Sequence, residues 1–210
     1  MLCGSHRSAI TGLKGNFKSN LRKGNVDGIN VIEVNQLYSN STGFLQRYWI
    51  FLSFVVICLP ILLKSKYDLI FATSTPLTVG LLGILGKWFK KKPFVFEVRD
   101  LWPELPKAMG VIKNPLILKV LSLIEWASYK SADRIIGLAP GIVDGIAKFG
   151  VATDRIHLIP NGCDEEFDGQ QRFLSDEHTR IIFSGAHGLA NGLDQILDIA
   201  VELKKRGRDD

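Results

Sequence analysis

Residues 68–98 read DLIFATSTPLTVGLLGILGKWFKKKPFVFEV, and this stretch carries the pattern that decides the fold. Two short apolar runs, at 68–73 and 94–98, frame a segment at 77–91 that is long enough for a helix. Runs that are apolar throughout, rather than alternating, are typical of parallel strands buried on both faces. A strand, a helix and a second strand in this order predict a β-α-β unit.

The same rhythm continues on both sides of this unit. Pro115 would stand in the first turn of a helix, where its missing N–H costs no hydrogen bond. A long loop with Pro103 and Pro106 follows the strand at 94–98, and the polar, basic residues 1–28 carry no predicted strand. The further predicted strands are 29–34, 134–138 and 155–159, and the further predicted helices are 44–65, 115–131 and 140–148. We therefore expect an α/β domain with a parallel sheet over residues 1–162.

A polar, acidic segment then breaks the rhythm, and we interpret 163–179 as a linker between domains. Residues 180–192 read as a strand that runs into a Gly-rich loop, and 193–206 read as a helix. Together, 180–210 would form the first β-loop-α unit of a second α/β domain. Because one such unit cannot bury its apolar face alone, we expect the sequence to be a fragment with a truncated second domain.

Charge is unevenly spread along the chain. The formal net charge is +5, but the first 92 residues hold 12 Lys and Arg against three acidic residues. A basic first half is typical of a protein that meets an anionic surface, either nucleic acid or a membrane with acidic lipids. No nucleic-acid-binding motif accompanies this charge, so we expect no nucleic acid partner. The 46% hydrophobic content excludes a disordered protein.

The most apolar stretch, at 48–63, has two readings. It is shorter than the ~20 residues of a spanning helix, and Pro60 interrupts it, which leaves a core helix or a helix in the membrane interface. A basic, aromatic cluster farther along suits either a solvated helix end or a membrane surface. Its members are Lys87, Trp88, Phe89, Lys90, Lys91 and Lys92.

The compartment is indicated by two absences. The N-terminus has no apolar core of a signal peptide, and the three cysteines are scattered without metal-ligand spacing. Both features favour a reducing, cytoplasmic location.

Charged side chains gather at the end of the strand at 94–98, in the stretch FEVRDLWPE. They are Glu97, Arg99, Asp100 and Glu104. The last residues of parallel strands face a crevice, so the cluster predicts a site. The alternative is that Arg99 and Asp100 pair with their neighbours and clamp the loop.

Five stretches resemble glycosyltransferase family 4, whose members have the two Rossmann-like domains of the GT-B fold. They are FEVRDLWPELPKAMGVI, FATSTPLTVGLLG, IIGLAPGIVDGIAKFGV, IPNGCDEEF and FSGAHGLANGLDQILD. Within the family the chain is most similar to enzymes that build bacterial O-antigen and colanic-acid-type polysaccharides, including fucosamine transferases. On this resemblance the first strand and Gly-rich loop of the first domain would lie before Met1, and most of the donor-binding domain after Asp210.

The resemblance implies a retaining, hexosyl-type transferase that moves a sugar from a nucleotide-sugar donor to a polyprenyl-linked saccharide. Such an enzyme would work peripherally on the inner face of the cell membrane. The resemblance implies no cofactor, because the nucleotide sugar is a substrate, and the sequence carries no metal motif. The first rival is a non-catalytic α/β module that binds a membrane or a partner. A nicotinamide-dependent enzyme is disfavoured because no G-x-G-x-x-G is present.

The resemblance also gives roles to the strand-end cluster. Many family members carry a His-Asp pair here, facing the cleft between the domains, where this chain has Arg99 and Asp100. An arginine stays protonated and cannot be a general base, but it can hold a phosphate or the charge of a departing nucleotide diphosphate. Asp100 would orient an acceptor hydroxyl. Glu97 and Glu104 are further substrate-binding candidates, and Trp102 is expected to pack rather than to stack on a sugar.

Gly185 stands where the family brings its backbone close to the donor diphosphate. The family's usual Arg and Lys in this loop align with Ala186 and Asn191, so that the neutralising charge must come from elsewhere. His187 is either a polar contact to the donor or plain surface. The expected hinge residues are Asn161, Gly162 and Asp164, whose residue types suit a turn.

Overall fold

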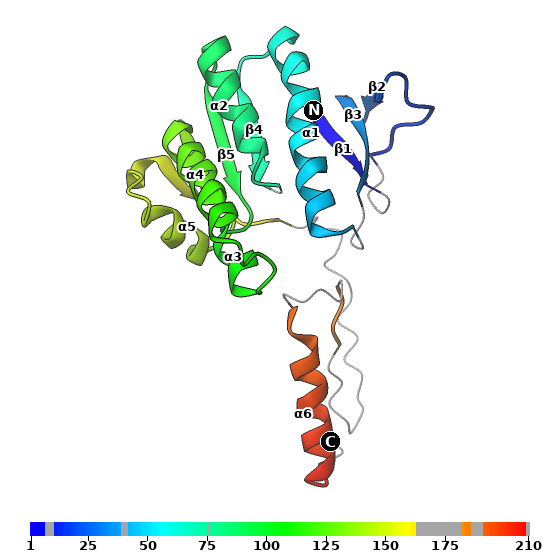
Figure 1. Ribbon diagram of the computed structural model, residues 1–210, viewed down its shortest axis with the longest axis vertical. Helices are drawn as coiled ribbons and strands as arrows, with labels where there is room; N and C mark the ends of the chain where they lie inside the picture. Colours follow the sequence, from blue (N-terminus) through cyan, green and yellow to red (C-terminus); the bar gives the residue numbers. More distant parts are fainter. Residues whose placement is uncertain (7–10, 39–41, 75, 163–181, 186–190, 209–210) are drawn as a thin grey trace.

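The computed structural model places two β-sheets beside a layer of helices (Figure 1). It describes residues 1–6, 11–38, 42–74, 76–162, 182–185 and 191–208.

The larger sheet contains four strands in the order β4-β5-β6-β7, and every neighbouring pair is parallel. The strands are β4 (Ile70–Ser74), β5 (Phe94–Val98), β6 (Arg134–Gly137) and β7 (Ile156–Leu158). All four were expected from their apolar runs, although β7 is shorter than predicted because a 3₁₀ turn, Thr153–Arg155, precedes it. The predicted α/β class with a parallel sheet is confirmed.

Helix α2 (Val79–Lys90) lies directly on this sheet because glycines replace side chains at the contact. A Cβ atom on Gly83 would stand 2.1 Å from the Phe94 ring, and one on Gly80 would stand 2.2 Å from Ser128 Oγ of α4. The second helix of the layer is α4 (Pro115–Ser131), and α5 (Pro140–Ala147) packs against β6 and β7. The predicted helices therefore all form.

The main core lies between the sheet and this helix layer. Phe94 and Phe96 of β5 are fully buried, with ring centroids 5.7 Å apart, and Phe96 also meets Tyr129 of α4 at 6.1 Å. Each aromatic side chain removed from water in this way contributes about 2–3 kcal/mol. The buried Phe94, Phe96 and Val98 alternate with half-buried Val95 and Glu97, so that β5 directs Glu97 to the other face of the sheet.

The expectation that residues 1–28 carry no strand is wrong. They contain β1 (Leu2–His6) and β2 (Leu21–Val26), which flank β3 (Ile29–Tyr38) in a second sheet of order β1-β3-β2. Strands β2 and β3 form a hairpin across Asp27 and Gly28, whose φ angles are 49° and 86°. Two central residues with positive φ form the type I′ turn that suits a two-residue hairpin loop.

Helix α1 (Phe44–Lys64) has 21 residues and continues through Pro60, so Pro60 does not interrupt it and the helix is not too short to span a membrane, contrary to expectation. Among the described helices, α1 alone is long and apolar enough to cross a membrane by length and composition. The segment that meets this test is Gln46–Lys64, with a mean hydropathy of 1.8, and 22% of it is buried. One face packs through Phe54, Val55, Cys58 and Leu62, against a core that includes Val34 of β3 and Leu82 of α2. The length and composition of α1 fit a core helix as well as a membrane helix.

Two further segments differ from expectation. The loop after β5 contains a short helix, α3 (Glu104–Ala108), in which Pro106 is buried. Residues 182–185 form no strand, and 180–181 lie outside the described residues. Helix α6 (Leu193–Lys205) forms as predicted and stands apart from the other helices in Figure 1. None of its residues is buried.

Candidate functional site

The strand-end cluster lies at the carboxyl edge of the four-stranded sheet. The strand ends are level here, because Ser74 is paired with Val98 and Val98 with Gly137. The chain leaves β5 at Arg99, and Figure 1 shows α6 beyond the same edge of the sheet. Carboxyl ends of parallel strands are where open α/β sheets bind their ligands.

Arg99 is anchored by its backbone and half-exposed at its tip. Its N–H donates to Oγ of the buried Ser74 at 3.0 Å, whereas its side chain is 45% exposed. The guanidinium Nη1 lies 3.6 Å from Glu97 Oε1, and Glu97 Oε1 also accepts from Thr73 Oγ1 at 2.8 Å. A loose ion pair at a partly exposed site is weak, so the guanidinium retains the capacity to bind an anion. The Arg99 backbone is thus held in place, and its guanidinium has Glu97 as a charged neighbour.

The remaining members of the cluster differ in burial. Asp100 is half-buried at the bend that follows β5, and Glu104 is exposed at the first residue of α3. Trp102 packs against the main core, as expected of a packing residue. Its Nε1 is buried and has no hydrogen-bond partner among the described residues. The structure thus brings Glu97, Arg99 and Asp100 together at one strand end.

Glu125 on α4 is a buried acid near this loop and was not found by sequence reasoning. Its side chain is 2% exposed and accepts a hydrogen bond from Tyr129 Oη at 2.9 Å. Burial raises the pKa of the Glu125 carboxyl to about 7; the hydrogen bond from Tyr129 opposes the rise, the charge of Glu104 adds to it, and the nearby Trp102 backbone N–H opposes it. The one sequence signal is an acid inside an apolar helix stretch, LSLIEWASY.

The other predicted site residues are not joined to this cluster. Asn161 and Gly162 are exposed and follow β7, two strands away from β5 in the sheet. Gly185 is exposed, with the Phe183 ring 3.1 Å from where its Cβ would stand. Asp164 and His187 lie outside the described residues. Within the described part of the chain, no group of three His, Cys, Asp or Glu side chains could hold a metal ion.

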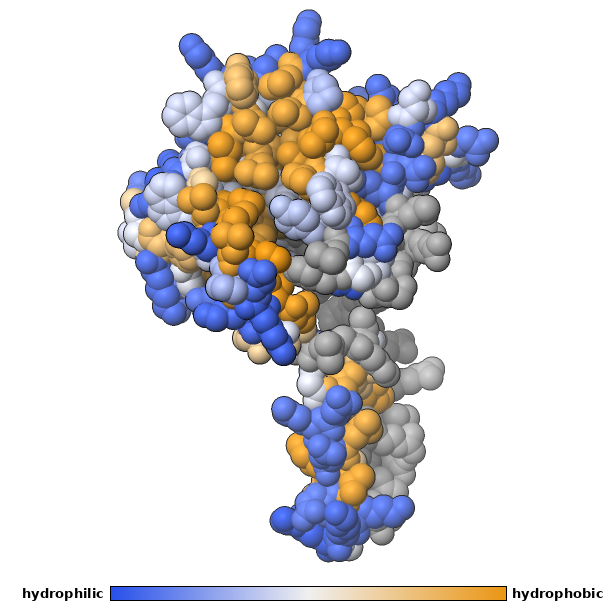
Figure 2. Space-filling model, in the orientation of Figure 1, coloured by the Kyte–Doolittle hydropathy of each residue, from blue (hydrophilic) through white to orange (hydrophobic). Residues whose placement is uncertain are grey.

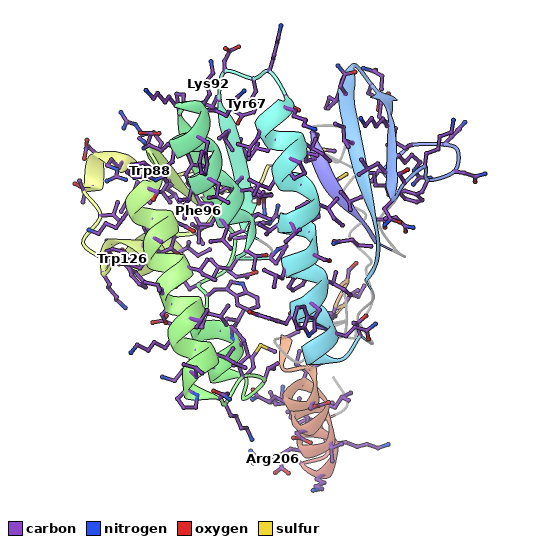
Figure 3. All side chains as sticks on the ribbon, turned by 45° about the horizontal axis from the view of Figure 1, so that its top comes forward. Tyr67, Trp88, Lys92, Phe96, Trp126 and Arg206 are labelled. Carbon is purple, nitrogen blue, oxygen red and sulfur yellow. The ribbon has the colours of Figure 1, made fainter. Side chains whose placement is uncertain are left out.

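The predicted basic cluster lies at the opposite, amino edge of the sheet, around the end of α2 (Figure 3). Lys87 Nζ lies 2.7 Å from Asp133 Oδ1, and Lys92 Nζ lies 3.4 Å from Asp68 Oδ1. Trp88 is 72% exposed. A shallow hollow of about 500 Å³ is lined by Lys87, Trp88, Lys91, Lys92, Pro93 and Asp133. Two of the four lysines, Lys87 and Lys92, therefore form ion pairs within the chain.

The fold and its charged strand end define an α/β protein with a candidate site at the carboxyl edge of a parallel sheet. The profile of Glycosyltransferase Family 4 matches residues 18–167, which is more than half of the chain. The chain belongs to this family. No curated protein matches the sequence.

Solved structures of Anabaena Alr3699/HepE show a distant likeness. The complex with UDP and glucose has 15% sequence identity and a TM-score of 0.39, covering 65% of this chain and 32% of that one. The complex with UDP-glucose has 14% identity and a TM-score of 0.37, covering 62% and 31%. The complex with UDP alone has the same identity, TM-score and coverages as the complex with UDP-glucose. The chain thus spans about a third of the length of these structures.

Proposed function

We propose that this chain is the acceptor-side part of a retaining glycosyltransferase that moves a hexosyl-type sugar from a nucleotide-sugar donor to a lipid-linked saccharide. The acceptor would be an intermediate of a cell-surface polysaccharide of the O-antigen or colanic-acid type, and fucosamine is one candidate sugar. Membership of Glycosyltransferase Family 4 supports the transferase class. The observation that carries the proposal is the half-exposed Arg99 guanidinium beside Asp100 at the carboxyl edge of the sheet.

In this proposal Arg99 stabilises the negative charge that develops on the departing nucleotide diphosphate. A guanidinium presents several N–H donors in one plane and keeps its charge, which suits it to phosphate oxygens. Glu97 lies 3.6 Å from the guanidinium Nη1, and Thr73 Oγ1 holds Glu97 in turn by donating to its Oε1 at 2.8 Å. Asp100 orients the acceptor hydroxyl, and Glu104 is placed to bind a further polar group of the substrate.

A lipid-linked acceptor requires access to a membrane, and the helix layer offers a surface for it. Figure 2 shows hydrophobic residues gathered over α1, α2 and α4. The exposed apolar residues of this layer include Trp49, Val56, Trp88, Phe89, Leu116, Leu123 and Trp126. Lys90 and the exposed Lys91 lie at the end of α2, and no ion pair engages either within the described part of the chain. We propose peripheral contact with the inner face of the cell membrane through this surface.

The catalytic part is tested with the full protein product of the gene and, separately, with residues 1–210, which we expect to transfer no sugar alone. Transfer of label is measured from a panel of nucleotide sugars to a polyprenyl-diphosphate-linked saccharide. Arg99→Ala should lower kcat by about 100-fold, the scale of losing one oxyanion-type donor, and Asp100→Asn should be comparably damaging. Arg134→Ala is the matched control, because Arg134 lies at the opposite edge of the same sheet. Near-normal kcat in both site variants would make Arg99 and Asp100 a structural clamp, whereas no transfer by the unchanged protein would leave a non-catalytic binding module.

The membrane part is tested by co-sedimentation with neutral and anionic vesicles. Each lysine near an anionic surface contributes up to about 1 kcal/mol, so Lys90→Gln with Lys91→Gln should weaken binding to anionic vesicles by about tenfold. Added salt should weaken the binding of the unchanged protein. Lys204→Gln with Lys205→Gln on α6 is the matched control. Equal sedimentation of both double variants on both vesicle types would exclude the basic cluster from membrane binding.

A further inference from the structure

A threonine, a glutamate and an arginine form a closed group in the smaller sheet. The buried Glu33 accepts from Thr11 Oγ1 at 2.8 Å, and from Arg22 Nη2 and Nε at 2.7 Å and 3.0 Å. Arg22 Nη1 donates to the Gly15 carbonyl at 3.1 Å, and the guanidinium carbon lies 4.6 Å from the centre of the Phe17 ring. The guanidinium is held on several sides, so this group fixes the loop to the sheet.

The same three residue types form an open group at the strand end. Thr73 of β4 and Glu97 of β5 are paired in register, and Thr73 Oγ1 donates to Glu97 Oε1 at 2.8 Å. Arg99 Nη1 lies 3.6 Å from the same oxygen, which is too far for a hydrogen bond. Within the described residues this is the one ionic contact of Arg99. The glutamate is therefore held more closely by the threonine than by the arginine.

We propose that Glu97 is the resident counter-ion of Arg99 and that an anionic ligand with two or more negative charges displaces it. A partly exposed ion pair at this distance is weak, and a phosphate group can accept two N–H donors of the planar guanidinium. A monoanion gains little by replacing a carboxylate that is already present. Glu97 thus selects the ligand by its charge and does not itself bind it. That the ligand is a nucleotide diphosphate rests on the proposed function.

Thr73 allows Glu97 to remain in place when the guanidinium turns to the ligand. Glu97 Oε1 then keeps the hydrogen bond from Thr73 Oγ1, and its side chain keeps its contact with water. Without that donor, a carboxylate that is mostly buried would be left less well satisfied and would hold its cation more firmly. Loss of the hydroxyl should therefore weaken ligand binding, whereas neutralising Glu97 should strengthen it.

Binding of inorganic pyrophosphate to the 210-residue chain tests the exchange of partners without a sugar substrate. The signal is the NMR shift of the Arg99 Nε–Hε group, which is assigned by its absence from Arg99→Ala. Glu97→Gln should lower the dissociation constant by about two- to fivefold, the range that loss of a partly exposed ion pair allows. Asp144→Asn is the matched control, because it removes the same charge from an exposed position on α5 and should leave the constant unchanged.

Three results of this titration would overturn the proposal. They are a dissociation constant that is unchanged or higher in Glu97→Gln, an equal decrease in Asp144→Asn, and no shift of the Arg99 signal by pyrophosphate in either protein.

Substitutions of Thr73 separate a displaced counter-ion from a purely structural pair. Thr73→Val should raise the dissociation constant by about twofold or more, and Thr73→Ser, which keeps the hydroxyl, should bind like the unchanged chain. In Glu97→Gln, Thr73→Val should have no further effect, because no counter-ion remains to be displaced. A structural pair would weaken binding in both single variants, and that result would contradict the proposal.

The selection by charge is tested with nitrate, a planar monoanion. At equal ionic strength, nitrate should shift the Arg99 signal in Glu97→Gln but not in the unchanged chain, and equal shifts in both would overturn the selection. Since no activity is measured, failure of the proposed sugar transfer leaves these binding results unaffected. Conversely, failure of the opposite signs at Thr73 and Glu97 leaves the kinetic test of Arg99 unaffected.

Discussion

The two ends of the four-stranded sheet both carry charge, but they hold it in different ways. At the carboxyl edge, the backbone of Arg99 donates to the buried Ser74, and Leu101 of the following loop packs against Gly145 of α5. At the amino edge, Trp88 and Phe89 are 72% and 68% exposed. The first end fixes the direction of a few charged groups, which suits recognition of one ligand geometry. The second end offers exposed charge and exposed apolar area, which suits contact with an extended surface such as lipid.

One helix, α2, contributes to both ends of the sheet, and we expect the largest effect from a substitution at its contact with the sheet. Helix α2 begins near the carboxyl edge and ends in the basic cluster, and Gly83 lies at its closest contact with the sheet. Gly83→Ala would place a Cβ 2.1 Å from the fully buried Phe94 ring, and we expect a loss of about 3 kcal/mol of unfolding free energy. Urea unfolding measures it. Gly141→Ala is the control, because its Cβ would meet nothing within 4 Å, and an equal loss there would contradict the argument.

The stability of the carboxyl-edge region should depend on pH through the buried Glu125. The folded-state pKa of Glu125 lies at about 7, above its ordinary value of 4.5, so the folded chain holds this proton more tightly than the unfolded chain. Its contribution to stability is fully present below about pH 4.5 and is lost as the pH rises through 7. The unfolding free energy should therefore fall by about 2–3 kcal/mol between pH 4.5 and 7.5 relative to Glu125→Gln. If the unfolding free energy depends on pH in the same way in both proteins, a raised pKa for Glu125 is excluded.

The third prediction concerns the amino edge, where backbone conformation can be separated from charge. Lys91 caps α2 with φ 53° and ψ 38°, a left-handed conformation that glycine adopts without strain. Lys91→Gly should raise the unfolding free energy by up to about 1 kcal/mol. Lys90→Gly removes the same charge from the last helical residue and should lower stability by about 0.5–1 kcal/mol. The same sign of change in both variants would show that lost charge decides stability here.

The smallest expected effect is at Asp133, the partner of Lys87. Burial acts to raise the pKa of Asp133, but hydrogen bonds from Lys87 and from the Phe94 N–H outweigh it and lower the pKa. The stabilisation it gives is therefore present above its ordinary pKa of 3.8 and is lost as the pH falls through its lowered value. With Asp133 43% exposed, Asp133→Asn should cost about 0.5 kcal/mol at pH 7. Thermal unfolding at pH 7 and pH 3 checks it, and a cost that grows at pH 3 would contradict the assignment.

One strand that the sequence analysis does not predict nevertheless has a recognisable sequence signal beside it. Strand β2 reads LRKGNV, and its polar residues give no apolar run that would predict a strand. The Asp27-Gly28 pair beside it is a hairpin signal that local backbone chemistry explains without tertiary structure. By contrast, the helix at α4 was predictable from Pro115, and Asn114 caps it through hydrogen bonds to the Leu116 and Ile117 N–H groups.

The sequence by itself determined the β-α-β order, the helices and the charged strand end that includes Arg99 and Asp100, because apolar runs and the residues between them act over a few positions. Only the tertiary structure decided which charged side chains form ion pairs. Lys87 and Lys92 look like their neighbours in the sequence, but Asp133 and Asp68 pair with them from distant parts of the chain. The burial of Glu125 could not be predicted from the sequence, because the exposure of a carboxylate depends on what packs against it in the folded chain.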